Sequence, residues 1–224
     1  MKPAILAAAL LLALSAPASG VDESLPECAA RAIAAVQARY EKVEDLSADF
    51  VQESRSMALG GGGLAARSQG HVVFAKPGRM RWTYTGPEES LVVSDGEWLW
   101  IFDPAAGEAQ KLPVGDGALS GAAVQFLLGE GDVLDEFTVT ELACGADEVR
   151  LELLPRAPAT FEKLRIAVAP ASGDMHETEV TDLFGNVTSV RFENIRVNTA
   201  PGPAVFRFEA PPGVEVIELE RPPG

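Results

Sequence analysis

The most regularly spaced aromatic residues fall in one short stretch, and their chemistry suits the binding of an apolar group. All three tryptophans lie between residues 76 and 103. Side chains alternate between the two faces of a β-strand, so two sets would each share a face: Met80, Trp82 and Tyr84, and Trp98, Trp100 and Phe102. If both faces belong to one sheet, they form a broad aromatic surface. That surface is either an ordinary packed core or a binding site for an apolar ligand, and the sequence leaves both interpretations open.

A basic cluster adjoins the first aromatic set in a chain that is otherwise acidic. Lys76, Arg79 and Arg81 surround the turn Pro77-Gly78, whereas the whole sequence has a formal net charge of −15. One interpretation is a polar strand face opposite the aromatic one. The other is a positive rim at the mouth of an apolar pocket, where it would meet an acidic surface of a partner protein.

Groups for catalysis or metal binding are sparse. The two histidines, His71 and His176, are far apart in the sequence, and no Gly-x-Ser-x-Gly motif is present. Glu88 and Glu89 are adjacent, so on a strand their carboxylates would point to opposite faces rather than act as an acid and base pair. Two histidines and two separated cysteines also lack metal-ligand spacing. We therefore expect no enzyme activity, no metal and no cofactor.

The first 20 residues have the pattern of a secretory signal peptide. Lys2 precedes an apolar run over residues 4–14, and small residues follow, so cleavage after Ala18 or after Gly20 fits. Because no Cys follows either site directly, we expect a periplasmic protein without a lipid anchor. Residues 21–224 are expected to form a single, monomeric domain without stable membrane insertion. The acidic charge disfavours nucleic acid as a partner.

The two cysteines, Cys28 and Cys144, are an even number in an exported chain, which favours a disulfide. The bond would tie an N-terminal helix to a distant strand. The alternative is a pair of unpaired, buried thiols.

The pattern of apolar residues predicts a mainly β protein with two amphipathic helices. The first helix is expected over residues 24–44, where Ser24 and Glu27 form a capping box, and the second over residues 118–128. After a change of period at Leu46, about eleven short antiparallel strands are expected, over residues 65–76, 79–85, 90–94, 97–103, 108–114, 133–142, 148–154, 161–169, 175–182, 187–198 and 205–209. The simplest packing curls the sheet and lays both helices on its concave side as a lid.

Several motifs, in their order, resemble those of the outer-membrane lipoprotein carrier family, LolA. They are Leu46-Ser47-Ala48-Asp49-Phe50-Val51-Gln52, Lys76-Pro77-Gly78-Arg79-Met80-Arg81-Trp82, Val93-Ser94-Asp95-Gly96, Asp182-Leu183-Phe184-Gly185-Asn186 and Pro211-Pro212-Gly213-Val214. The resemblance implies an open, incomplete β-barrel with an apolar cavity. It also implies transfer of acylated lipoproteins from an inner-membrane ABC transporter to an outer-membrane receptor. Lys76 departs from the Arg that family members often have before the Pro.

On this resemblance the expected lipid-binding residues are Met80, Trp82, Trp98, Trp100, Phe102, Phe126 and Phe184, and the expected partner-facing basic rim is Lys76, Arg79 and Arg81. An empty cavity would close by packing the helices on the tryptophans, which offsets part of the energy of acyl burial and permits release. The alternative function is a periplasmic sensor or interaction module on the same scaffold, without lipid transport.

Overall fold

The structure is a computed structural model that describes residues 25–57, 66–114 and 133–219. Two features expected from the sequence lie outside these ranges: the signal peptide, and the second helix, which was expected over residues 118–128 and to include Phe126. None of the helices within the described ranges is long and apolar enough to cross a membrane.

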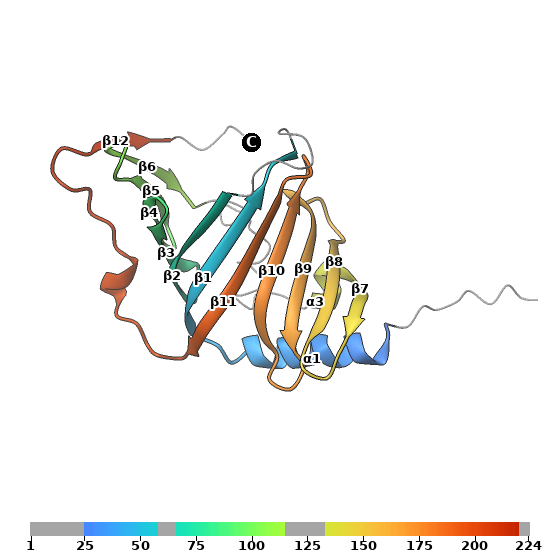
Figure 1. The fold of residues 1–224 in the computed structure, drawn as a ribbon. Helices are drawn as coiled ribbons and strands as arrows, with labels where there is room; N and C mark the ends of the chain where they lie inside the picture. Colours follow the sequence, from blue (N-terminus) through green and yellow to red (C-terminus); the bar gives the residue numbers. More distant parts are fainter. Residues whose placement is uncertain (1–24, 58–65, 115–132, 220–224) are drawn as a thin grey trace, which may run out of the picture.

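The described strands form one curled sheet of twelve strands in the order β12-β6-β5-β4-β3-β2-β1-β11-β10-β9-β8-β7. Neighbours are antiparallel except β12 and β6, which are parallel. The strands are β1 (Asp45–Arg55), β2 (Ala66–Ala75), β3 (Arg79–Gly86), β4 (Glu89–Asp95), β5 (Trp98–Asp103), β6 (Glu108–Pro113), β7 (Phe137–Cys144), β8 (Val149–Pro155), β9 (Phe161–Ala169), β10 (Asp174–Asp182), β11 (Val187–Val197) and β12 (Glu215–Glu218). Figure 1 shows β2 to β6 turned away from the plane of β7 to β11. The predicted open, mainly β fold is confirmed.

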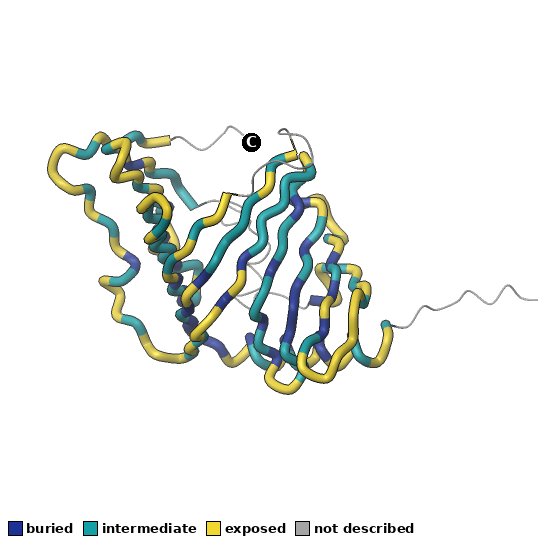
Figure 2. Tube along the Cα trace, viewed as in Figure 1, coloured by how far each residue is buried: buried dark blue, intermediate teal, exposed yellow. Residues whose placement is uncertain are grey.

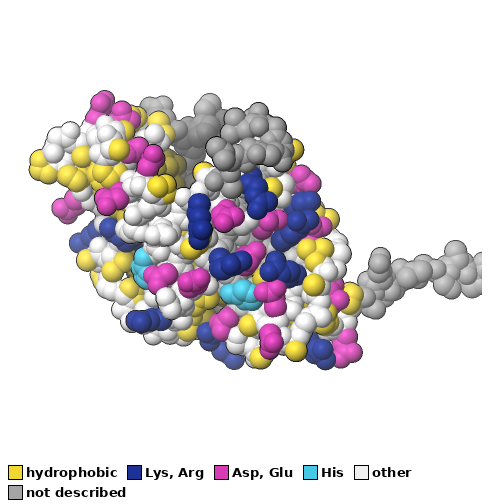
Figure 3. Space-filling view, in the orientation of Figure 1, with side chains coloured by type: hydrophobic (Ala, Val, Ile, Leu, Met, Phe, Trp, Pro, Cys, Tyr) yellow, Lys and Arg dark blue, Asp and Glu magenta, His cyan; other side chains and the backbone are white. Residues whose placement is uncertain are grey.

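Alternation of apolar and charged residues explains why the sheet has one buried face and one solvent-exposed face. In β8, Leu151 and Leu153 are fully buried, while Arg150, which precedes them, is exposed. On the outer face, ion pairs bridge neighbouring strands: Arg165 lies 2.9 Å from Glu152 and 3.1 Å from Glu179. Figure 3 shows this face with charges of both signs intermixed. The apolar side chains therefore gather on the opposite, concave face.

Helix α1 (Glu27–Tyr40) covers part of the concave face. Its buried stripe contacts β7, β8, β9 and β10 and consists of Ala29, Ala32, Ile33, Val36 and Tyr40. The helix begins after Pro26 without a side-chain cap, and Ser24 of the expected capping box lies outside the described residues. Its C-terminal end is held by two contacts: the Lys76 ammonium donates to the Tyr40 carbonyl at 2.9 Å, and Arg39 pairs with Asp174 at 2.9 Å.

Two expected strands differ from the structure. Residues 133–142 begin as a short helix, α3 (Val133–Glu136), before β7 starts. Residues 205–209 are not a strand, because Pro203 starts a 3₁₀ helix, η2 (Pro203–Phe206), in which Phe206 is buried against the outer face near β3 and β4. The final strand, β12, has only four residues and was not expected from so short a pattern. Figure 2 shows that the C-terminal segment leading to β12 is mostly exposed.

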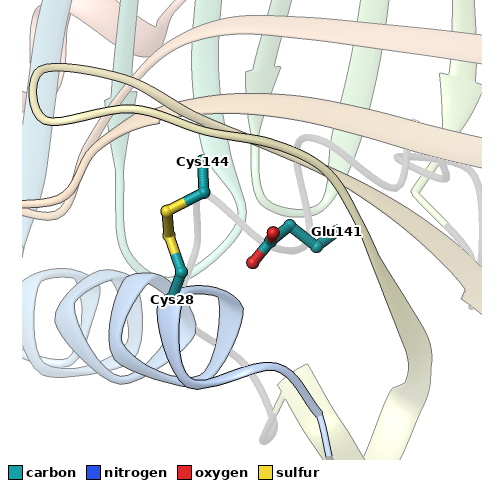
Figure 4. A group of neighbouring side chains, drawn as sticks. All are labelled: Cys28, Glu141 and Cys144. Carbon is teal, nitrogen blue, oxygen red and sulfur yellow. A yellow bond between two sulfur atoms is a disulfide. The ribbon is translucent and has the colours of Figure 1, made fainter.

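The expected disulfide is confirmed: Cys28 of α1 is bonded to Cys144 of β7, across 116 residues of sequence, and neither cysteine is free. Figure 4 shows the bond between the helix and the strand, with Glu141 beside it. The three residues lie close enough to suggest a metal site, but the two sulfurs are already bonded to each other and offer no thiolate.

We predict that replacing both Cys28 and Cys144 by serine lowers the free energy of unfolding by about 4 kcal/mol, because the bond closes a long loop in the unfolded chain. Urea unfolding of the variant and of the wild type, with and without reductant, measures the difference. Reductant should destabilise the wild type only. Equal stabilities of the two proteins in its absence would contradict the prediction.

A second prediction concerns the buried phenol of Tyr40. Burial raises the pKa of Tyr40 to about 12, and the amide of Met175 donates a hydrogen bond to its oxygen at 3.3 Å. Because the folded-state pKa lies above the unfolded value of about 10, the protonated phenol favours folding below pH 10, and this contribution is lost as the pH rises toward 12. The stability of wild type relative to Tyr40→Phe should therefore fall by up to ~2 kcal/mol between pH 9 and pH 12. Urea unfolding of both proteins across this range tests the prediction, and a constant difference would refute it.

Candidate functional site

On strands β1 to β6, most side chains of the inner face of the sheet are apolar. The register aligns Phe74, Met80, Ser94 and Leu99 in one row and Val72, Trp82, Val92 and Ile101 in the next. Cross-strand partners project from the same face, so these two rows form one continuous surface. Met80 and Trp82, two of the expected lipid-binding residues, lie side by side on it.

Aromatic rings surround Trp82 on this face. Its ring centroid lies 4.8 Å from that of Phe50, 5.6 Å from Phe74 and 6.4 Å from both Tyr84 and Phe192. Edge-to-face and stacked pairs at these distances attract beyond simple area burial. The sequence reasoning missed the contribution of the phenylalanines, although the alternation of Ala48 and Phe50 carries the signal.

The Phe50 ring fits because β2 has a glycine opposite it. Gly70 pairs with Phe50 on one side and with Tyr84 on the other. A β-carbon at Gly70 would overlap the carbonyl oxygen of Thr83 and lie 3.0 Å from the Phe50 ring. Residue 70 therefore sets the spacing at which β2, β3 and the rings pack.

Enclosure decreases from β2 to β5 along the row of Val72, Trp82, Val92 and Ile101, whereas Leu99 in the neighbouring row is only 6% exposed. Phe50 and Phe74 are each only 2% exposed, Trp82 and Val92 are half-buried, and Ile101 on β5 is 38% exposed. The apolar surface therefore continues past the part that is fully packed.

Polar groups on the inner face satisfy one another. The Ser94 hydroxyl donates to the Gly78 carbonyl at 3.2 Å and accepts from the Gly96 amide at 3.1 Å. Tyr84 donates to the Gln52 side-chain oxygen at 3.2 Å. Burial raises the pKa of the Tyr84 phenol, so it remains neutral. An apolar group lying on this face would thus leave these hydrogen bonds intact.

Trp98, Trp100 and Phe102 do not join Trp82, because they lie on the opposite face of the sheet. Trp100 pairs with Val93, which pairs with Arg81, whereas Trp82 pairs with Val92. The ring of Phe208 packs 5.2 Å from Trp100 and 5.3 Å from Phe102. The expected single surface containing all three tryptophans is therefore not formed.

Lys111 completes the packing on this outer face. Its ammonium lies 4.0 Å from the centre of the Trp98 ring and 5.5 Å from that of Trp100, and it pairs with Glu218 of β12 at 2.9 Å. These cation–π and ionic contacts bind the C-terminal segment to β5 and β6. The outer tryptophans thus have a structural partner.

The three basic residues of the expected rim contact backbone carbonyls. Lys76 binds the end of α1, as described above, Arg79 donates to the Lys76 carbonyl at 2.8 Å, and Arg81 donates to the Val205 carbonyl at 3.2 Å. The Arg79 guanidinium also lies over the Phe206 ring, 5.2 Å from its centre. Together they connect β3 to α1 and to the C-terminal segment.

Each histidine is paired with a carboxylate. His71 lies 2.9 Å from Asp49, and His176 lies 2.7 Å from Glu148. Hydrogen bonds from Asn194 and then His71 lower the pKa of Asp49, and those from His176 and Arg150 lower the pKa of Glu148. Both pairs are accessible to solvent, and no nucleophile accompanies them among the contacts of the described residues.

Phe184, the remaining expected lipid-binding residue, lies in the turn between β10 and β11. Its side chain is 85% exposed, the highest value for a large apolar residue in the described ranges. It therefore stands apart from the packed inner face.

Comparison with known proteins identifies a matching family model and relatives that carry the same description. A family model described as outer membrane lipoprotein carrier protein LolA matches residues 41–209. The outer-membrane lipoprotein carrier protein of Chromobacterium violaceum is 32% identical over 214 residues, which cover 94% of this chain and 93% of that protein. The protein of the same name from Ralstonia nicotianae is 30% identical over 214 residues, covering 94% and 95%.

A solved structure of an uncharacterized conserved protein from Thermus thermophilus has a TM-score of 0.52 to this chain. Its sequence identity is 11%, and the match covers 85% of this chain and 99% of the other. At that identity the similarity concerns the fold alone.

We predict that Gly70→Ala destabilises the protein by about 2–3 kcal/mol, because the added methyl meets the backbone of β3 rather than a flexible side chain. Gly86→Ala is the matched control, since its methyl would meet only the Gln69 side chain, at 3.8 Å, and should change stability by less than about 0.5 kcal/mol. Urea unfolding followed by tryptophan fluorescence measures both. Similar losses for the two variants would disprove this account of the packing.

Proposed function

Because this chain belongs to the LolA family of outer membrane lipoprotein carrier proteins, we propose that it is a periplasmic carrier, which binds the acyl chains of lipoproteins on the concave face of its sheet. The proposed route runs from an inner-membrane ABC transporter to an outer-membrane receptor. Residues 1–20 would direct export as a signal peptide. In this role the protein binds and releases cargo and catalyses no reaction.

The observation that carries the proposal is the incomplete enclosure of the inner face. Trp82 and Val92 are half-buried and Ile101 is 38% exposed, although all three belong to one apolar row. Adjacent apolar side chains that keep exposed surface form a continuous patch, which indicates a binding surface more strongly than a single exposed residue does. An acyl chain laid along this row would remove their apolar surface from water.

The energetics favour this use of the surface. Burial of each methylene of an acyl chain contributes about 0.8 kcal/mol. Binding to an apolar surface that excludes water therefore strongly stabilises a lipoprotein with long acyl chains. The hydroxyls of Ser94 and Tyr84 are already hydrogen-bonded within the protein. The row therefore offers an acyl chain contacts without leaving polar groups unsatisfied.

Among the residues expected to bind lipid, we assign this role to Met80 and Trp82, with Ile101 added. We assign Trp98, Trp100 and Phe102 to the attachment of the C-terminal segment, because Phe208 and Lys111 cover them. For Lys76, Arg79 and Arg81 we propose a structural role, since each donates to a backbone carbonyl: Lys76 holds the end of α1, and Arg79 and Arg81 hold η2 against the outer face.

We predict that Ile101→Glu weakens binding of a fluorescent fatty acid at least about tenfold, because it removes apolar contact and places a charge beside the acyl chain. The matched control is Leu154→Glu, on the outer face of β8, where the wild-type side chain is 39% exposed against 38% for Ile101. Fluorescence titration and displacement by unlabelled fatty acid give the affinities, and circular dichroism checks the fold. Met80 is less suited to this test, since at 7% exposure a charge there also disturbs folding.

Two results would refute the assignment. If Ile101→Glu and Leu154→Glu have equal effects, the inner row is not the binding surface. If the wild type binds no fatty acid and releases no lipoprotein from inner-membrane vesicles, the sensor or interaction module becomes the better description.

A further inference from the structure

A second apolar surface lies at the end of the sheet, away from the inner row. It consists of Met57, just after β1, and Leu183 and Phe184 in the β10–β11 turn, and we call it the apolar tip. Their exposed fractions, 55%, 64% and 85%, are the three highest among large apolar side chains in the described ranges. Figure 1 shows this end of β1, β10 and β11 opposite the end at which α1 lies.

The tip is one unit built from two segments of the chain. The Met57 amide donates to the Asn186 side-chain oxygen at 3.0 Å, and a β-carbon at Gly185 would lie 3.2 Å from the Met57 side chain. The pairing of Arg55 with Val187 sets the two segments beside each other. The three exposed side chains thus project from neighbouring positions.

The β10–β11 turn is fixed by its own hydrogen bonds. The Asp182 carboxylate accepts from the Phe184 amide and the Asn186 amide, both at 2.8 Å, and from the Asn186 side chain at 2.7 Å. The Gly185 amide donates to the Asp182 carbonyl at 3.0 Å, and Gly185 takes a φ of +81°, which favours glycine. The hydrogen bonds that the Asn186 side chain and the turn amides donate also lower the pKa of Asp182. Exposure of Phe184 is therefore imposed by a defined turn.

We propose that the apolar tip docks reversibly into the interfacial region of a zwitterionic phospholipid bilayer. A bilayer interface accepts a few protruding apolar side chains without needing a complementary shape. The amides of Phe184, Gly185 and Asn186 are already hydrogen-bonded within the turn, so contact with the apolar part of the interface would leave none of these three unsatisfied. The formal net charge of −15 disfavours a strongly anionic surface.

This docking does not depend on the proposed acyl-binding row. Met57, Leu183 and Phe184 share no contact with Trp82 among the aromatic and core contacts of the described residues. Membrane docking and acyl binding can therefore fail separately in experiments.

The test is co-sedimentation of the purified protein with phosphatidylcholine vesicles. We expect measurable partition for the wild type and a loss of about tenfold for Phe184→Ser, since removing one interfacial Phe forfeits roughly that much affinity. Leu142→Ser is the matched control, because Leu142 is a 48% exposed apolar residue on the edge strand β7, and it should change partition less than about twofold. Fatty-acid binding by Phe184→Ser should equal that of the wild type.

Three outcomes would overturn the proposal. They are no vesicle binding by the wild type, equal binding by Phe184→Ser, and equal losses for Phe184→Ser and Leu142→Ser. If Phe184→Ser instead loses fatty-acid affinity while vesicle binding is retained, Phe184 belongs to the acyl site and not to a membrane-docking tip.

Discussion

The structure depends on a mismatch between the width of the sheet and the length of the helix that packs on it. Twelve strands at about 4.8 Å each span roughly 50 Å. Helix α1 has 14 residues, which at about 1.5 Å per residue reach only ~21 Å. The helix therefore covers β7 to β10, where Leu151 and Leu153 are fully buried, and does not extend over β4 and β5, where Val92 and Ile101 keep access to solvent. The concave face thus combines a large packed part, which supplies stability, with a smaller part around Val92 and Ile101 that retains exposed apolar surface.

Helix α1 is attached at both ends, which holds it over β7 to β10. The helix is held near its start by the bond between Cys28 and Cys144 and at its end by the Lys76 and Arg39 contacts. Constraints at both ends oppose a swinging motion of the whole helix. Both ends of α1 are thus attached to the rest of the protein, through Cys144 at the start and through Lys76 and Asp174 at the end.

The sequence predicted the main features of the fold, because strand alternation and the disulfide depend on local pattern and on cysteine number. It did not predict which face each tryptophan occupies, because that depends on pairing between strands. In β3 and β4 even-numbered residues pair with even-numbered ones, as Trp82 does with Val92, but β4 and β5 pair Val92 with Ile101. This change in register places Trp100 on the face opposite Trp82. A shift of one residue in a hairpin has this effect on every side chain of the strand, and the shift follows from loop length, which the pattern of apolar residues does not define to one residue.

The parallel pairing of β12 with β6 has a consequence for the solution behaviour of the molecule. A sheet that curls without closing leaves an edge of unpaired amides and carbonyls, which is a template for another chain. Here the C-terminal strand occupies that edge, and it is only four residues long, with Glu215 and Glu218 at its ends. Short length and negative charge both discourage further strand addition. The short, acidic strand β12 thus disfavours strand addition at this edge of the sheet, while β7 forms the other edge.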